Sequence, residues 1–133
     1  MCTYPKEFKK HIEEIVACWK PRLLLHCYSI SFKYQTKKKG DADASIIVDD
    51  CYLQGIINIF PSLLDDWTCK NYKDVENTLV HELVHIITNG FSNIAEKYTP
   101  ELFHGNLEHE NEKLVQTIAN ILIYNKEKDT ISK

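Results

Sequence analysis

The residues best suited to chemistry are two histidines and a glutamate in the segment HELVH. His81 and His85 are four positions apart. On an α-helix, side chains with this spacing lie on one face a turn apart, so both imidazoles can bind one metal ion. Glu82 follows His81 directly, so its side chain is rotated by one residue step around the helix axis. Its carboxylate is therefore expected beside the open coordination position of the metal and not on the metal itself.

Such a set of side chains is suited to hydrolysis. Zinc held by three protein ligands keeps a fourth position for water and lowers the pKa of that water to about 7. A neighbouring carboxylate can accept the proton while the water attacks a carbonyl. The spacing therefore predicts a zinc site with His81 and His85 as ligands and Glu82 as general base.

The flanking sequence predicts the helix that this site needs. From about residue 74 to residue 89 the sequence predicts a strong helix, because Asp74 can cap the start and Gly90 can end it. Its apolar positions are Val75, Leu79, Val80, Leu83, Val84, Ile86 and Ile87. A polar strip runs along the same helix: Thr78, His81, Glu82, His85 and Asn89. A polar strip on a helix fit for burial needs a partner, which favours a metal. The alternative is a solvent-facing strip without metal, although surface strips more often carry Lys and Glu.

A third ligand has to come from elsewhere, and segment 103–112 offers several histidines and glutamates. Apolar positions from Leu107 to Leu122 define the inward face of a last helix, and Glu108 and Glu112 share one flank of that face. A side chain on this flank can reach a metal on the neighbouring helix. Helical geometry therefore narrows the third ligand to Glu108 or Glu112 and leaves the choice between them open.

Before the site helix, the period of the apolar residues changes from helical to β-like. Helical spacing predicts a helix over residues 5–19, and alternation predicts a strand over residues 27–34. Two further β-like runs follow at residues 44–52 and 55–60. Their short connections make an antiparallel meander the simplest arrangement.

After the strands, Pro61 ends the sheet and a short helical turn is expected at residues 62–67. Residues 91–106 look irregular because they contain helix breakers, and a final helix is expected over residues 107–124. This order of elements predicts an α+β fold in which helices cover one face of the sheet. The 133 residues fit one domain, taken as residues 1–125, with a flexible tail at residues 126–133.

Composition and charge argue against several classes of partner. The net charge is -3, and positive charge gathers only in the run of residues 37–39, so no nucleic-acid partner is expected. No apolar run approaches the length of a membrane span, so no membrane partner is expected either. The oligomeric state cannot be read from these features.

The cysteines indicate the compartment. There are 5 of them, and no two have the two-residue separation of a zinc knuckle or a redox motif. Each is expected to behave as a small buried apolar residue. The N-terminus lacks the apolar stretch of a secretory signal, so free thiols predict a cytoplasmic protein.

The segment NTLVHELVHII resembles the active-site helix of zinc-dependent peptidases of the gluzincin kind. The wider layout is similar to small phage- and prophage-encoded metallopeptidases, in which a segment like ASIIVDDCYLQGIINIFP and a Trp precede TLVHELVH, and a helix opening with Glu follows. This resemblance covers most of residues 5–124. It implies a minimal zincin-like domain with a mainly antiparallel three-stranded sheet, zinc held by His81, His85 and Glu112, and Glu108 as the reserve ligand. A phage origin would place the protein in the host cytoplasm.

Two other families are more distant resemblances. SprT-like proteases also carry HExxH but take their third ligand from a later histidine followed by glycine, which His104-Gly105 imitates. The residues that follow Gly105 lack the aromatic residue expected there. Repressor-cleaving metallopeptidases of mobile elements share the plan of HExxH plus Glu, and Ala119-Asn120 is a faint match to their downstream signature.

The expected function is a zinc-dependent metallopeptidase, a hydrolase that cleaves peptide bonds in a peptide or protein substrate through a water activated by Glu82. An edge strand of the sheet could bind an extended peptide over the zinc. The alternative is a zinc-binding interaction module that engages a host protein without turning over substrate. An intact Glu82 argues against the alternative, because a purely structural zinc site has no use for that carboxylate.

Overall fold

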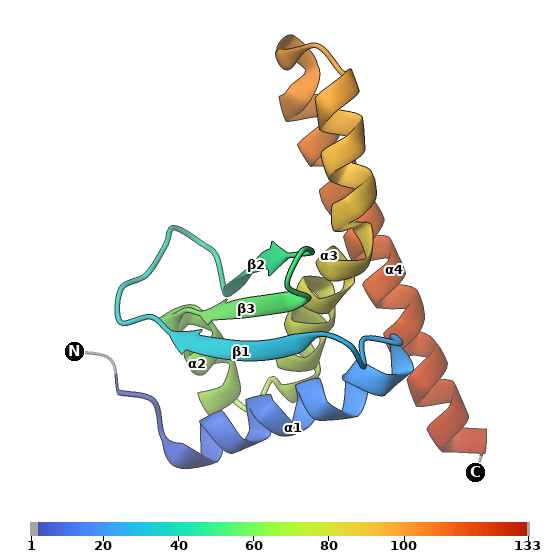
Figure 1. Cartoon of the computed structure of the whole chain (residues 1–133). Helices are drawn as coiled ribbons and strands as arrows, with labels where there is room; N and C mark the ends of the chain where they lie inside the picture. Colours follow the sequence, from blue (N-terminus) through green and yellow to red (C-terminus); the bar gives the residue numbers. More distant parts are fainter. Residues whose placement is uncertain (1–2, 133) are drawn as a thin grey trace.

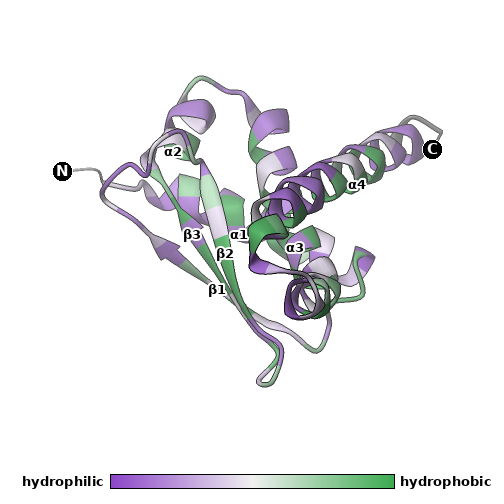
Figure 2. Cartoon of the chain, turned by 90° about the horizontal axis from the view of Figure 1, so that it is seen from above, coloured by the Kyte–Doolittle hydropathy of each residue, from purple (hydrophilic) through white to green (hydrophobic). Residues whose placement is uncertain are grey.

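The computed structural model describes residues 3–132, and this part of the chain folds into helices packed on one face of a three-stranded sheet (Figure 1). The expected α+β class is confirmed. The first helix, α1 (Lys6–Arg22), buries the apolar stripe that predicted it: Phe8, Ile12, Ile15, Val16 and Trp19. Figure 2 shows the strands side by side with the helices gathered on one side of them.

The sheet consists of β1 (Ser29–Tyr34), β2 (Ala44–Asp49) and β3 (Gln54–Ile59). The expected meander is wrong, because the spatial order is β1-β3-β2. β3 pairs in parallel with β1 and antiparallel with β2, so the sheet is mixed.

Burial explains why β3 takes the centre. Its residues Gly55, Ile57, Asn58 and Ile59 are buried, whereas β1 alternates between exposed and half-buried side chains. The most apolar strand gains most from neighbours on both sides. The connection at residues 35–43 is long enough to carry β2 past β3 to the far edge, and β2 is therefore an edge strand.

Helices complete the domain. α2 (Pro61–Thr68) is the short helix expected after the sheet. α3 (Tyr72–Tyr98) does not end at Gly90 but continues for eight further residues. A 3₁₀ turn, η1 (Glu101–Phe103), leads into α4 (His104–Ser132). The expectation of an irregular segment over residues 91–106 is therefore wrong except at the turn around residues 99–103.

α4 also runs through the segment expected to be a tail. Lys126 Nζ lies 2.6 Å from Glu76 Oε2, and Lys73 Nζ lies 3.0 Å from Glu127 Oε1. These ion pairs hold α4 on α3 past the boundary expected at residue 125. The last residue, Lys133, lies outside the described residues.

The core forms where α1, α3, α4 and the sheet meet. Its largest fully buried side chains include Trp19, Leu79, Leu83 and Val115. The far half of α3 and the first turns of α4 extend beyond this core as a helical hairpin (Figure 1). The polar residues of HELVH lie on α3 just before it leaves the core.

The cysteines differ from expectation. Cys18, Cys27, Cys51 and Cys69 are free and exposed, and Cys2 lies outside the described residues. Cys18 lies on the outer face of α1, between the buried Val16 and Trp19. None of the helices within residues 3–132 combines the length and apolar character needed to span a bilayer.

Candidate metal centre

α3 fixes the two histidines by burying the opposite side of the helix. Val80, Leu83 and Val84 are fully buried in the core. His81 and His85 therefore face outward one turn apart, with side chains 16% and 17% exposed. Their Nε2 atoms are 3.2 Å from each other. The helical spacing thus brings both ring nitrogens to one point, as the sequence predicts.

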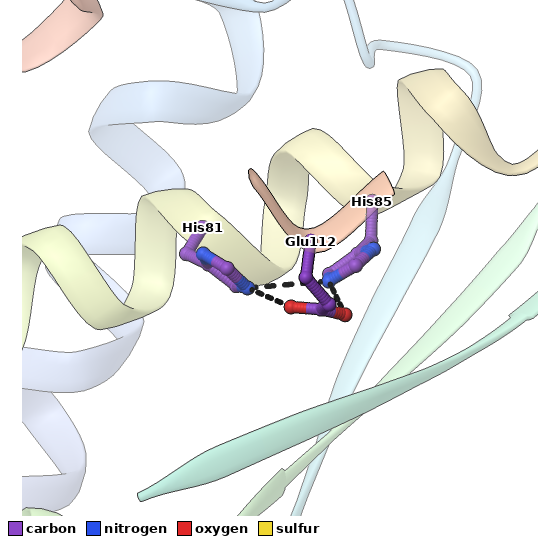
Figure 3. Close-up of side chains that lie close together, drawn as sticks. All are labelled: His81, His85 and Glu112. Atoms are coloured by element: carbon purple, nitrogen blue, oxygen red, sulfur yellow. Dashed lines mark hydrogen bonds and ion pairs between the residues drawn. The ribbon is translucent and has the colours of Figure 1, made fainter. Parts of the chain in front are cut away.

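Glu112 reaches the same point from α4. Its Oε2 lies 3.0 Å from His81 Nε2, and its Oε1 lies 3.0 Å from His85 Nε2 (Figure 3). The buried Val115 and Ala119 pack α4 against the core just beyond this residue. The ligand atoms of these three residues all lie within 4.8 Å of one another, and within the described residues they form the one such group of His, Cys, Asp or Glu.

The distances fit a tetrahedral ion. Zn–N and Zn–O bonds of about 2.0–2.1 Å place neighbouring ligand atoms about 3.3 Å apart in a tetrahedral site. The Nε2–Nε2 separation is 3.2 Å and the two Nε2–carboxylate separations are 3.0 Å. Two imidazoles and a carboxylate are also a donor set that zinc accepts at catalytic sites with an open position. The residues therefore fit zinc in both chemistry and spacing.

Glu82 lies in the same pocket but is not one of the converging ligands. Its side chain is buried at 7% exposure. Burial first, and then the nearby charge of Glu112, raises the pKa of Glu82 to about 8. A carboxyl group with a pKa near neutrality can both accept and return a proton, which is the requirement for general acid–base catalysis.

Burial acts on His85 in the opposite direction. It lowers the pKa of His85, and the negative charge of Glu112 opposes that change. Lowering the pKa favours the neutral imidazole, which is the form that binds a metal.

An amide network behind His81 fixes how its ring is protonated. His81 Nδ1 lies 2.9 Å from Gln116 Oε1, and Gln116 Nε2 donates to Asn77 Oδ1 at 2.9 Å and to Asn120 Oδ1 at 2.8 Å. Because Gln116 uses its amide protons on the two asparagines, its oxygen must accept from His81 Nδ1–H. The lone pair of a neutral His81 is then on Nε2, which faces Glu112.

The amides of Asn77, Gln116 and Asn120 were not predicted from the sequence as part of the site. The signal was nevertheless present, because Asn77 precedes His81 by four residues on α3, and Gln116 and Asn120 follow Glu112 at the same interval on α4. Each of the two facing helices therefore carries a row of polar residues that recur every four positions. Such rows are visible in the sequence only after the pairing of the two helices is known.

A pocket of about 300 Å³ opens beside the ligands. One wall is β2, with Ala44, Ser45, Ile46 and Val48, and the other is Glu82, His85, Asn89 and Glu112. Asn89 Nδ2 donates a 2.6 Å hydrogen bond to Asp50 Oδ2, just after β2. This bond ties the site helix to the edge strand, so the pocket has defined walls on both sides.

The reserve ligands lie elsewhere. Glu108 and His104 line a second pocket, of about 360 Å³, on the helical hairpin together with Glu96. His104 Nε2 donates to the Thr99 carbonyl at 2.9 Å, and its Nδ1 lies 3.6 Å from Glu96 Oε1. The structure therefore brings Glu112, and neither Glu108 nor His104, to the two histidines.

Comparison with known proteins assigns no family to this chain. No protein-family model matches the sequence, and neither a curated protein nor a solved structure matches the chain.

The amide network makes a prediction about zinc affinity. Gln116→Leu removes the acceptor of the His81 Nδ1–H bond, so it should weaken zinc binding about 10-fold to 100-fold, the loss typical of an outer-shell change. Gln116→Glu keeps an acceptor at this position and is the matched control. Competition with a chelator measures the affinities, and equal zinc affinity of Gln116→Leu and the wild type would contradict the network.

Proposed function

We propose that this protein is a zinc-dependent metallopeptidase. The observation that carries the proposal is the convergence of His81, His85 and Glu112 at spacings that suit zinc, with Glu82 buried beside them in an open pocket. The resemblance of HELVH to gluzincin active sites points to the same chemistry. The proposed substrate is a peptide or protein.

In this mechanism the residues of the site have different roles. His81, His85 and Glu112 would hold the ion, and Gln116 would keep the His81 lone pair directed at it. When bound, zinc acidifies water and polarises a carbonyl group. Glu82 would accept the proton of the attacking water and deliver it to the amine that leaves.

The pKa of Glu82 suits this role once a cation is present. Burial and the charge of Glu112 both raise that pKa to about 8. Coordination of Glu112 would offset its negative charge and so remove one of the two causes. Glu82 would then ionise at a lower pH and act as a base near neutrality, while burial keeps its basicity above that of an exposed carboxylate.

A catalytic site fits this set of residues better than a structural zinc site does. Structural zinc is usually enclosed by four Cys or His ligands. Here three residues converge, one of them is a half-exposed glutamate, and the described cysteines lie outside the group. The arrangement leaves room for water and for a substrate carbonyl.

The site predicts that zinc binding depends on Glu112 and not on Glu108. Purified wild type should hold about one zinc ion per chain. His81→Ala and Glu112→Ala should each weaken zinc binding more than about 100-fold, beyond the loss typical of an outer-shell change. Glu108→Ala removes the same side chain one turn earlier on α4 and should bind zinc like the wild type. Metal analysis and competition with a chelator measure these affinities, and the reverse ranking of the two glutamates would contradict the site.

A second prediction separates catalysis from binding. Glu82→Gln keeps the shape of the side chain but cannot accept a proton, so it should retain zinc and lose about 10²–10⁴-fold in peptide hydrolysis. Cleavage of a peptide library, read by mass spectrometry of the new termini, provides the measurement. Equal cleavage by both proteins would rule out Glu82 as the base. A zinc-loaded wild type that cleaves no peptide would favour the non-catalytic interaction module.

A third prediction concerns how the substrate lies. β2 is an edge strand and forms one wall of the pocket, so an extended peptide could pair with its free edge and pass the zinc. Methylating single backbone amides of a cleaved peptide should lower kcat/KM about tenfold or more at the positions that pair and little at those that alternate with them. An unchanged rate for every methylated peptide would exclude strand pairing.

A further inference from the structure

The projecting half of α3 carries a stripe of large apolar side chains that no other part of residues 3–132 covers. Ile87, Phe91, Ile94 and Tyr98 are 47%, 82%, 60% and 77% exposed. They recur at intervals of four, three and four residues, so they lie along one face of the helix. We call these four residues the α3 stripe.

The stripe is specific to one side of the hairpin. On the neighbouring helix, the exposed residues between Gly105 and Lys113 are polar or charged, apart from the glycine itself. Beside the stripe, Thr88, Gly90 and Ala95 carry no charge, and Lys97 is the charged residue there. An apolar centre with few charges around it is the composition of a protein interface core.

Gly90 supplies an independent observation. It lies inside α3, where glycine destabilises a helix, and a Cβ built at this position meets nothing within 4 Å. No contact among the residues that the structure describes therefore requires a glycine here. Because Gly90 borders the α3 stripe, its small size would let a second helix approach closely.

We propose that the α3 stripe is an interface with a second copy of this chain, whose own stripe lies antiparallel on it. The spacing four, three, four reads the same in both directions, so a two-fold axis between residues 92 and 93 brings the stripe into register with itself. Ile87 then packs on Tyr98 of the second copy, and Phe91 packs on Ile94 of the second copy. Each of these residue pairs combines one aromatic ring with one isoleucine, so the side-chain volume is similar at every level of the interface.

Charge and area fit this pairing. In the antiparallel register, Lys97 lies beside Gly90 of the second copy, and the two Lys97 side chains are about nine residues of helix rise apart, or roughly 13 Å. They therefore do not repel each other at contact distance. The stripe exposes on the order of 600 Å² per copy, so pairing would bury on the order of 1,200 Å², which a specific interface requires. The two projecting hairpins would form a four-helix bundle.

The test is sedimentation velocity of the full chain with saturating zinc and a reductant, because the exposed cysteines could otherwise crosslink. The wild type should form a concentration-dependent dimer. Phe91→Glu and Ile94→Lys should each weaken dimerisation about 100-fold or more, since each change occurs twice in the dimer. Leu114→Lys alters an exposed apolar residue of α4 outside the stripe and should leave the dimer intact. Circular dichroism should show the same helix content for all four proteins, because the substituted side chains are largely exposed.

Mixing tests the register itself. In the antiparallel pairing, position 91 of one copy faces position 94 of the other, so the Phe91→Glu and Ile94→Lys chains together should form a heterodimer that neither forms alone. A wild type that stays monomeric up to near-millimolar concentration would overturn the proposal and leave the stripe to another protein. A dimer that survives both stripe variants, or a mixture that stays monomeric, would also overturn it. The outcome is independent of peptidase activity.

Discussion

The packing of α4 across α3 determines what the polar face of α3 can do. α3 buries Val80, Leu83 and Val84, and this burial orients His81 and His85 away from the core. Val115 and Ala119 dock α4 beside them, which sets Glu112 opposite the two rings. A shift of one turn along α4 would present Glu108 or Gln116 instead. The three-residue centre is thus a consequence of the register between two helices.

Because the two histidines are largely buried, this register between α3 and α4 has chemical consequences. The lone pairs of two imidazoles and a carboxylate converge where little water reaches the histidines, and like groups brought this close require a proton or a cation between them. Behind them, the amides of Asn77, Gln116 and Asn120 satisfy one another in a closed network. Between α3 and α4, the amide groups therefore satisfy their own hydrogen bonds, whereas the two histidines and Glu112 form a group suited to binding an ion.

The sequence predicts the local features well and the long-range pairings poorly. The spacing of His81 and His85, the helical stripe of α1 and the β-alternation of β1 are all properties of short segments, and the structure agrees with them. The order of the strands depends on which strand gains most from a central place, and the meander assumed from short connections was wrong. Helical geometry alone left Glu108 and Glu112 open, because the register between two helices cannot be read from either one. Gly90 was interpreted as a helix end, which hid the apolar stripe that continues beyond it.

X-ray absorption at the zinc edge of the zinc-loaded wild-type protein tests the central claim most directly. The account predicts four-coordinate zinc with two imidazoles and the remaining ligands oxygen, all at about 2.0–2.1 Å. The measurement is discriminating because thiols compete for added zinc, and the four cysteines within residues 3–132 are all exposed. Sulfur scattering at about 2.3 Å, or a zinc shell without two imidazoles, would contradict the account.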